Sequence, residues 1–137
     1  MADLSITAAS VAKVSGAVID TTYVAGETIT AGQVLYVKSS DGKLYKAQCD
    51  GTTEESTVYG IALNGASSGQ PVAVLTGGQI TAGATLTVGA FYYLSATAGG
   101  ICPYADLVST NKVVQIFYGA TSAIATLSKI VTGVAVP

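Results

Sequence analysis

Residues 24–47 decide the fold of this chain, because their pattern occurs twice. The stretch reads VAGETITAGQVLYVKSSDGKLYKA, and residues 81–104, 57 positions later, read TAGATLTVGAFYYLSATAGGICPY. Seven of the 24 aligned positions are identical, and three of the seven are glycines. Because glycine is favoured where a side chain would strain a turn, glycines repeated at a fixed offset indicate a repeated backbone path. The sequence predicts an internally duplicated β module, with one copy in residues 24–76 and the other in residues 81–127.

Short runs of β-branched and aromatic residues, separated by turn residues, continue along the whole chain. About ten such runs follow one another roughly every ten residues, which is typical of a β-sandwich or barrel. The clearest hairpin turn is at residues 39–43, where Asp-Gly suits a tight connection. Gly60, inside the run 58–63, indicates a bulge or a close backbone approach. We therefore expect residues 1–137 to form one all-β domain, a jelly-roll-like sandwich or barrel.

The composition disfavours several classes of partner. Half of the 137 residues are apolar and a tenth are charged, with six lysines, no arginine and a net charge of −2. Nucleic-acid binding requires clustered basic residues, so we expect no nucleic-acid partner. No apolar run is long enough to span a bilayer, so we expect no membrane partner. The opening residues lack the features of a signal peptide, so we expect the chain to be made and assembled inside a cell.

The residues needed for catalysis are scarce. Histidine is absent, Ser39 lies near lysines only at a hairpin tip, and Glu54 and Glu55 fall in a polar loop. The two cysteines, Cys49 and Cys102, cannot complete a metal shell without histidine or a close pair of thiols. We expect them to be buried free thiols, although sequence alone leaves a disulfide open. The prediction is a protein with no catalytic site, metal or cofactor.

Two segments are candidates for contact with a partner. Residues 1–16 are rich in alanine and serine, and they could form an extended arm or a first strand. In the run Phe91-Tyr92-Tyr93, alternation along a strand places Tyr92 opposite its two neighbours. One face of that strand should join the core, and the other could anchor a protein interface, where tyrosine is enriched. We take Tyr92 as the outward-facing residue.

Four stretches together resemble the small capsid decoration (cement) proteins of tailed bacteriophages and prophages. The stretches are MADLSITAA (1–9), ETITAGQVLYVKSSDGKLYKA (27–47), YGIALNGASSGQPVAVLTGG (59–78) and LTVGAFYYLSATAGGICPYADL (86–107). The resemblance covers nearly the whole chain, and it lies in the order of the pieces, since each is short.

The resemblance implies a non-enzymatic structural virion protein, made in the host cytoplasm and bound to the exterior of an icosahedral capsid. Its partners would be major capsid proteins of the HK97-type fold and its own copies, as a homodimer or homotrimer. Residues 2–11 could add a strand to the sheet edge of a capsid protein. The candidate contact residues are Ala2, Asp3, Leu4, Ser5, Ile6 and Tyr92.

An alternative reading is a carbohydrate- or receptor-binding module of a phage fibre or adhesin. Such sites use exposed aromatic residues and polar loops, but they often contain tryptophan, which this chain lacks. An enzyme is a third possibility, which the absence of histidine and arginine disfavours. Binding to glycans would favour the alternative, and stoichiometric binding to a capsid lattice would favour the decoration protein.

Overall fold

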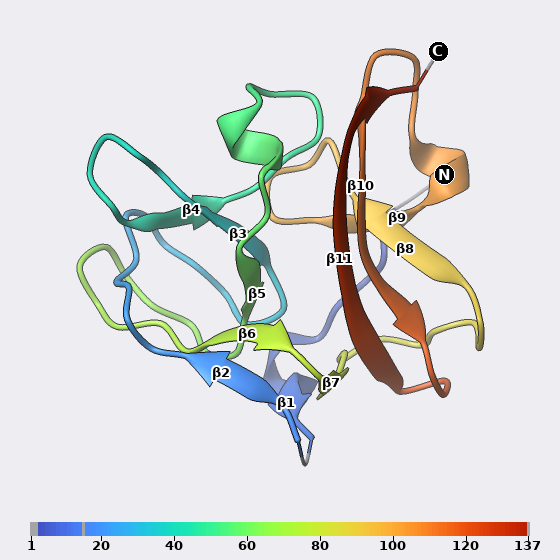
Figure 1. Ribbon diagram of the computed structural model, residues 1–137. Coiled ribbons are helices and arrows are strands. Elements are labelled where there is room, and N and C mark those ends of the chain that lie inside the picture. Colours follow the sequence, from blue (N-terminus) through green and yellow to red (C-terminus); the bar gives the residue numbers. More distant parts are fainter. Residues whose placement is uncertain (1–2, 15, 137) are drawn as a thin grey trace.

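The computed structural model describes residues 3–14 and 16–136, and these form two antiparallel β-sheets (Figure 1). The strands are β1 (Ala12–Lys13), β2 (Val18–Asp20), β3 (Val34–Val37), β4 (Leu44–Lys46), β5 (Gly60–Ala62), β6 (Val74–Gly77), β7 (Gln79–Thr81), β8 (Phe91–Leu94), β9 (Ile101–Pro103), β10 (Lys112–Gly119) and β11 (Ile124–Ala135). The 3₁₀-helices are η1 (Ala8–Ser10), η2 (Glu54–Ser56) and η3 (Tyr104–Asp106). The predicted all-β sandwich is confirmed. No helix among the described residues has the length and apolar character needed to cross a membrane.

Each half of the chain builds most of one sheet. The five-stranded sheet has the order β2-β6-β5-β3-β4, and the six-stranded sheet has the order β1-β7-β11-β10-β8-β9. Strands β3, β4 and β5 correspond to β8, β9 and the end of β10 at an offset of 57 residues, and even the register agrees. Val34 pairs with Ile61, and 57 positions later Phe91 pairs with Tyr118. The two halves share a backbone path, whereas a gene duplication and a jelly-roll topology stay predictions.

The main hydrophobic core lies between the two sheets, and a smaller core covers the outer face of the five-stranded sheet. The main core includes Val34, Tyr36, Ile61, Leu75, Ile80, Leu86, Tyr92, Leu94, Ile101, Ile116 and Phe117. The smaller core consists of Ala25, Ile29, Leu35, Leu44, Ala62, Ala66, Val72 and Val74. Burial of this apolar surface is the main favourable contribution to folding.

The two sheets do not pack through equivalent faces. The face of the five-stranded sheet that carries Val34 packs on the face of the six-stranded sheet that carries Tyr92, so residues at equivalent positions have different surroundings. In β3, Val34 belongs to the main core and Leu35 to the smaller core. In β8, the residue equivalent to Leu35 is Tyr92, which is in the main core, and the residue equivalent to Val34 is Phe91, which is exposed. The long β5–β6 connection, residues 63–73, contributes to the smaller core, whereas the β10–β11 connection, residues 120–123, is short. The short β10–β11 connection cannot cover the equivalent face of β8 and β10 in the same way. The five-stranded sheet packs on that face instead.

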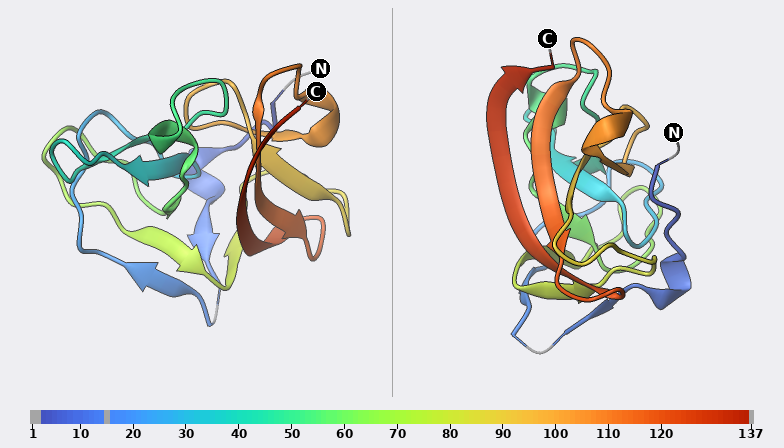
Figure 2. Two further views of the ribbon diagram at one scale, coloured as in Figure 1. Left: turned by 45° about the horizontal axis from the view of Figure 1, so that its top comes forward. Right: turned by 90° about the vertical axis from the view of Figure 1, so that its right-hand side faces the viewer.

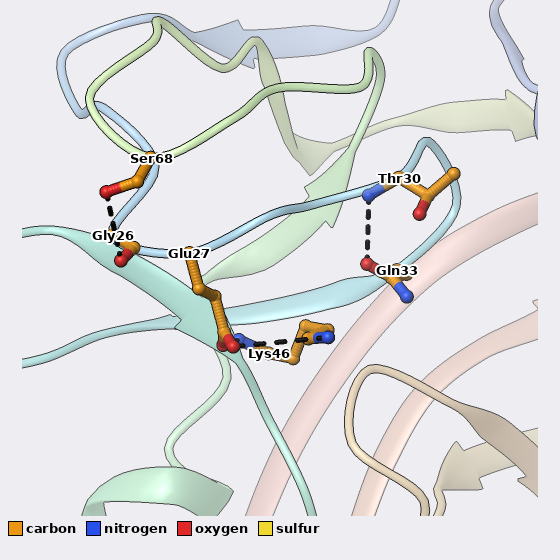
Figure 3. A network of polar contacts seen from close by, with 6 residues as sticks. All are labelled: Gly26, Glu27, Thr30, Gln33, Lys46 and Ser68. Atoms are coloured by element: carbon orange, nitrogen blue, oxygen red, sulfur yellow. Dashed lines mark hydrogen bonds and ion pairs between the residues drawn. The ribbon is translucent and has the colours of Figure 1, made fainter.

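Polar contacts connect the segment before β3 to the hairpin formed by β3 and β4 (Figure 3). Glu27 Oε2 accepts a hydrogen bond of 2.9 Å from the Lys46 backbone N–H, and Lys46 Nζ lies 4.0 Å from the other carboxylate oxygen. Gln33 Oε1 accepts a bond of 2.9 Å from the Thr30 N–H. The hairpin turn contains Gly42 at a φ of 69°, as its Asp-Gly sequence predicts. The residues of these polar contacts are Gly26, Glu27, Thr30, Gln33, Lys46 and Ser68 (Figure 3).

Candidate functional site

An uncharged group of four aromatic side chains lies on the outer face of the six-stranded sheet. Phe91 and Tyr93 come from β8, Tyr118 from β10 and Tyr104 from η3. The Phe91 and Tyr118 rings meet edge to face with centroids 5.7 Å apart, and the Tyr93 and Tyr104 rings do the same at 5.4 Å. Phe91 is 48% exposed. We call this surface the aromatic face.

Local backbone geometry explains why these rings point outward. Alternation along β8 sends Phe91 and Tyr93 to one side and Tyr92 to the other. In β10 a register shift between Gln115 and Phe117 indicates a β-bulge, which lets two successive residues, Ile116 and Phe117, both enter the core. The bulge returns the next residue of β10, Tyr118, to the outer face beside Phe91.

Every member of the aromatic face lies 57 positions after a residue of the main core. The four pairs are Val34 and Phe91, Tyr36 and Tyr93, Ala47 and Tyr104, and Ile61 and Tyr118. In the first half these positions pack against the second half, so the aromatic face is the copy of a packing surface that no other part of residues 3–14 and 16–136 covers. Exposed apolar surface of this kind commonly marks an interaction site.

Uncharged side chains also border the aromatic face. Gln115 pairs with Tyr93 on one side and with Ile130 on the other. Its amide nitrogen donates to the Ser128 carbonyl and hydroxyl, both at 3.0 Å, and so holds β10 against β11. Aromatic rings combine a large apolar area with few rotatable bonds, and the phenols add hydrogen-bonding groups. The surface suits an apolar partner with some polar groups better than a strongly charged one.

The interpretation of Tyr92 as the exposed interface residue is wrong. Tyr92 is 6% exposed, its ring packs against Phe117 at 5.6 Å, and its hydroxyl accepts a 2.9 Å bond from the Thr87 N–H. Alternation correctly placed Tyr92 opposite Phe91 and Tyr93, but it could not show which side faces the core. One difference between the two copies was visible in the sequence and marks this position as distinct: residue 91 is phenylalanine, whereas the equivalent residue of the first half is valine.

The N-terminal candidate residues lie against the chain's own surface. The Leu4 N–H donates to the Ile101 carbonyl at 2.7 Å, and Asp3 Oδ1 accepts a 2.6 Å bond from the Ser95 hydroxyl. Leu4 and Ile6 pack on the main core, whereas Ser5 is exposed. This segment already uses its apolar side chains within the chain, so contact with a capsid protein stays a prediction for it. Ala2 lies outside the described residues.

The residues considered for catalysis form local structural contacts. Ser39 donates a 2.5 Å hydrogen bond to the Glu54 carboxylate, and Glu55 accepts a bond from the Thr52 N–H at 2.8 Å. Among residues 3–14 and 16–136, no group of three or more histidine, cysteine, aspartate or glutamate side chains could hold a metal ion. The aromatic face is therefore the feature of the described chain that we take as the candidate site.

A contact at the middle of β11 also links this strand to the residue before β5. Lys129 Nζ donates to the Tyr59 carbonyl at 2.8 Å and lies 5.7 Å from the centre of the Tyr59 ring. Burial lowers the pKa of Lys129. The Tyr59 hydroxyl donates to the Asp20 carboxylate, and this bond raises the pKa of Tyr59 to about 12. These contacts hold the amine of Lys129, an exposed residue, against the main chain and ring of Tyr59.

The cysteine thiols should be unreactive in the folded protein. Cys49 and Cys102 are free and buried, and burial raises the pKa of Cys49 to about 11 and that of Cys102 to about 12. Because the thiolate is the reactive form, we expect almost no reaction with an aromatic disulfide reagent at neutral pH. After denaturation we expect two thiols per chain to react. Rapid reaction of the native protein, or none after denaturation, would contradict this arrangement.

Neither a scan against protein-family models nor a search of curated proteins found a match for this chain.

Proposed function

We propose that this protein is a structural virion protein that binds the outer surface of an icosahedral phage head and stabilises the shell by bridging major capsid proteins. The sequence resemblance to capsid decoration proteins suggests this role. The aromatic face carries the proposal, because it is an exposed, uncharged group of aromatic side chains on the outer face of the six-stranded sheet. Phe91 and Tyr118, on the neighbouring strands β8 and β10, are in direct contact with each other.

The aromatic and uncharged composition of the aromatic face is compatible with this role. A decoration protein needs a surface complementary to protein, and aromatic residues are enriched in such interfaces. Many copies bound to one lattice reinforce one another, so each contact can be modest in affinity. The role requires no catalytic residue and no cofactor.

The runner-up is a carbohydrate- or receptor-binding module, because exposed tyrosines also bind sugars. The ring geometry favours a protein partner. Neighbouring rings of the aromatic face are inclined by 60° and 71° to each other, so they do not form the flat platform on which a sugar chain stacks. Binding to a glycan array, together with no binding to heads, would favour this runner-up.

Co-sedimentation with expanded phage heads that lack the protein tests the proposal. We expect saturating, stoichiometric binding that raises the temperature at which the shell is disrupted. The Phe91→Ala variant should bind at least about fivefold more weakly, since truncating an aromatic anchor of an interface costs about 1 kcal/mol or more.

The matched control is Val18→Ala, which also shortens an exposed apolar side chain but on β2 of the other sheet. It should bind like the unchanged protein. If the folded protein bound no form of the head, the proposed function would be rejected. If both variants bound normally, the aromatic face would not be the contact surface.

A further inference from the structure

Asn64 and Gly65 lie at the start of the β5–β6 connection, residues 63–73, and they are the one Asn-Gly pair of the chain. An asparagine followed by glycine is the pair most prone to lose its side-chain amide, because the main-chain nitrogen of a residue without a side chain can approach the amide carbon closely. Gly65 is exposed and Asn64 is half-buried. The left panel of Figure 2 shows this connection in light green, on the side of the molecule away from β10 and β11.

Three hydrogen bonds hold the Asn64 amide between the two ends of this connection. Asn64 Oδ1 accepts a 2.7 Å bond from the Ala73 N–H. Asn64 Nδ2 donates to the Gly65 carbonyl at 3.0 Å and to the Pro71 carbonyl at 3.3 Å. A main-chain donor on one side of the amide and two acceptors on the other determine which of its atoms is oxygen and which is nitrogen. An amide fits this place, and a carboxylate does not.

We propose that Asn64 is a site of spontaneous deamidation, and that the closed β5–β6 connection protects it. In this reaction the Gly65 nitrogen attacks Asn64 Cγ, a new C–N bond forms, and the Cγ–Nδ2 bond breaks. Ammonia leaves, and water carries to it the proton that the Gly65 nitrogen gives up. A second water then opens the cyclic imide to aspartate or isoaspartate, so the chain gains a negative charge and nothing is oxidised or reduced.

The hydrogen bonds of Asn64 oppose this reaction while the connection is closed. Two of the three bonds end on Nδ2, the atom that leaves, so the reaction must break them. Nδ2 faces two carbonyl oxygens, which are acceptors only, so neither can give it the proton that it needs in order to leave as ammonia. The connection is also held by bonds of 2.8 and 2.9 Å between Ile29 and Ala66 and by the buried side chain of Val72. The reaction therefore requires a local opening of the connection, a motion that costs less than global unfolding.

Deamidation would weaken this part of the fold. With aspartate at position 64, an oxygen replaces Nδ2 and faces the Gly65 and Pro71 carbonyls, so that acceptors face acceptors without a hydrogen. With isoaspartate, the main chain before Gly65 is longer by a methylene carbon, which displaces Ala66 from its pairing with Ile29. In both products the connection closes less well over the smaller core, to which Ala66 belongs.

Peptide mapping by mass spectrometry tests the proposal on the unchanged protein. Folded protein and protein unfolded in urea are aged side by side in a mildly alkaline buffer made with heavy-oxygen water, which labels each deamidated residue. We expect Asn64 to react at least about tenfold faster in urea than in the folded protein. The other asparagine of the chain, Asn111, is the internal control and should react slowly in both states, because Lys112 follows it. No reaction of Asn64 in urea, or equal rates in the two states, would overturn the proposal.

Two matched variants test whether opening of the connection controls the rate. Val72→Ala and Val114→Ala remove the same atoms, the first from the smaller core and the second from the main core. In the folded protein, Val72→Ala should speed the deamidation of Asn64 at least about threefold, and Val114→Ala should leave it nearly unchanged. Equal effects of the two variants, or no effect of Val72→Ala, would show that the connection is not the protecting element.

Two further variants test the chemistry and its consequence. Gly65→Ala should slow the reaction of Asn64 even in urea, because a methyl group then obstructs the attacking nitrogen. Asn64→Asp, which reproduces one product, should melt at a lower temperature than the unchanged protein. Deamidation at an undiminished rate in Gly65→Ala would rule out the cyclic imide, and an unchanged melting temperature of Asn64→Asp would rule out the weakening by that product. None of these measurements involves a phage head, so their failure leaves the proposed head binding untouched.

Discussion

Replacement of Gly60 by alanine is expected to lower the free energy of unfolding by about 3 kcal/mol or more, which corresponds to a fall in melting temperature of about 10 °C. Gly60 lies in β5, between β3 and β6 at the centre of the five-stranded sheet. A Cβ atom there would be 2.2 Å from the Leu75 carbonyl oxygen and 2.6 Å from Val74 Cγ1. The carbonyl is main chain in the neighbouring strand, so it cannot move away without disturbing the sheet.

Gly65→Ala is the matched control for this effect. Gly65 has no left-handed φ, and the nearest atom to its Cβ position is the Ile29 carbonyl oxygen at an ordinary 3.5 Å. Alanine at this position should change stability by less than about 1 kcal/mol, and it can even raise stability by restricting the unfolded chain. Urea unfolding of both variants would measure the difference. Equal midpoints would show that β5 and β6 do not approach each other as described.

Replacement of Phe117 by alanine should cost about 3–5 kcal/mol of stability, because it leaves a cavity at the centre of the main core. The Phe117 side chain is fully buried and packs edge to face on Tyr92. A loss of this size is a large part of the stability of an ordinary domain, so the variant should be partly unfolded at moderate temperature.

The other phenylalanine of the chain, Phe91, provides the comparison. Because Phe91 lies on the aromatic face and is half exposed, Phe91→Ala should cost less than about 1 kcal/mol. Thermal unfolding of the two variants should therefore give very different midpoints. Similar losses would mean that the assignment of the inner and outer faces of β8 and β10 is wrong.

The strands and their turns could be predicted from local sequence. The Asp-Gly hairpin between β3 and β4 and the close approach at Gly60 follow from the demands of tight turns and central strands on glycine. The 57-residue repeat predicted a repeated backbone path, and β8 and β9 do form a hairpin in the same register as β3 and β4. These features depend on neighbours in the sequence or in the repeat, and both are visible without a structure.

The sequence could not show which face of each strand is buried, because the two sheets do not pack through equivalent faces. A repeat suggests that equivalent residues have equivalent surroundings, yet Val34 is buried and Phe91 is exposed. This difference depends on packing between the halves. For this reason Tyr92 was predicted on the wrong side, and the aromatic face was not predicted. Two members of that face, Tyr104 and Tyr118, come from η3 and β10, outside the strand that was considered.

The end of the chain illustrates a different difficulty. The polar residues Ser128 and Lys129 indicate a break between two strands, residues 123–127 and 130–136, but β11 is continuous from Ile124 to Ala135. Both polar side chains are accommodated by tertiary contacts: Ser128 accepts a bond from the Gln115 amide, and Lys129 donates to the Tyr59 carbonyl. Such contacts join residues far apart in the sequence, so no local pattern shows them.

An electron cryo-microscopy map of heads decorated with this protein would test the central claim most directly, since it locates both the protein and its contact surface. The account predicts ordered copies on the outside of the shell, with Phe91 and Tyr118 buried against capsid protein and the five-stranded sheet farther from it. A map with no such density, or one in which bound copies turn the aromatic face toward solvent, would contradict it.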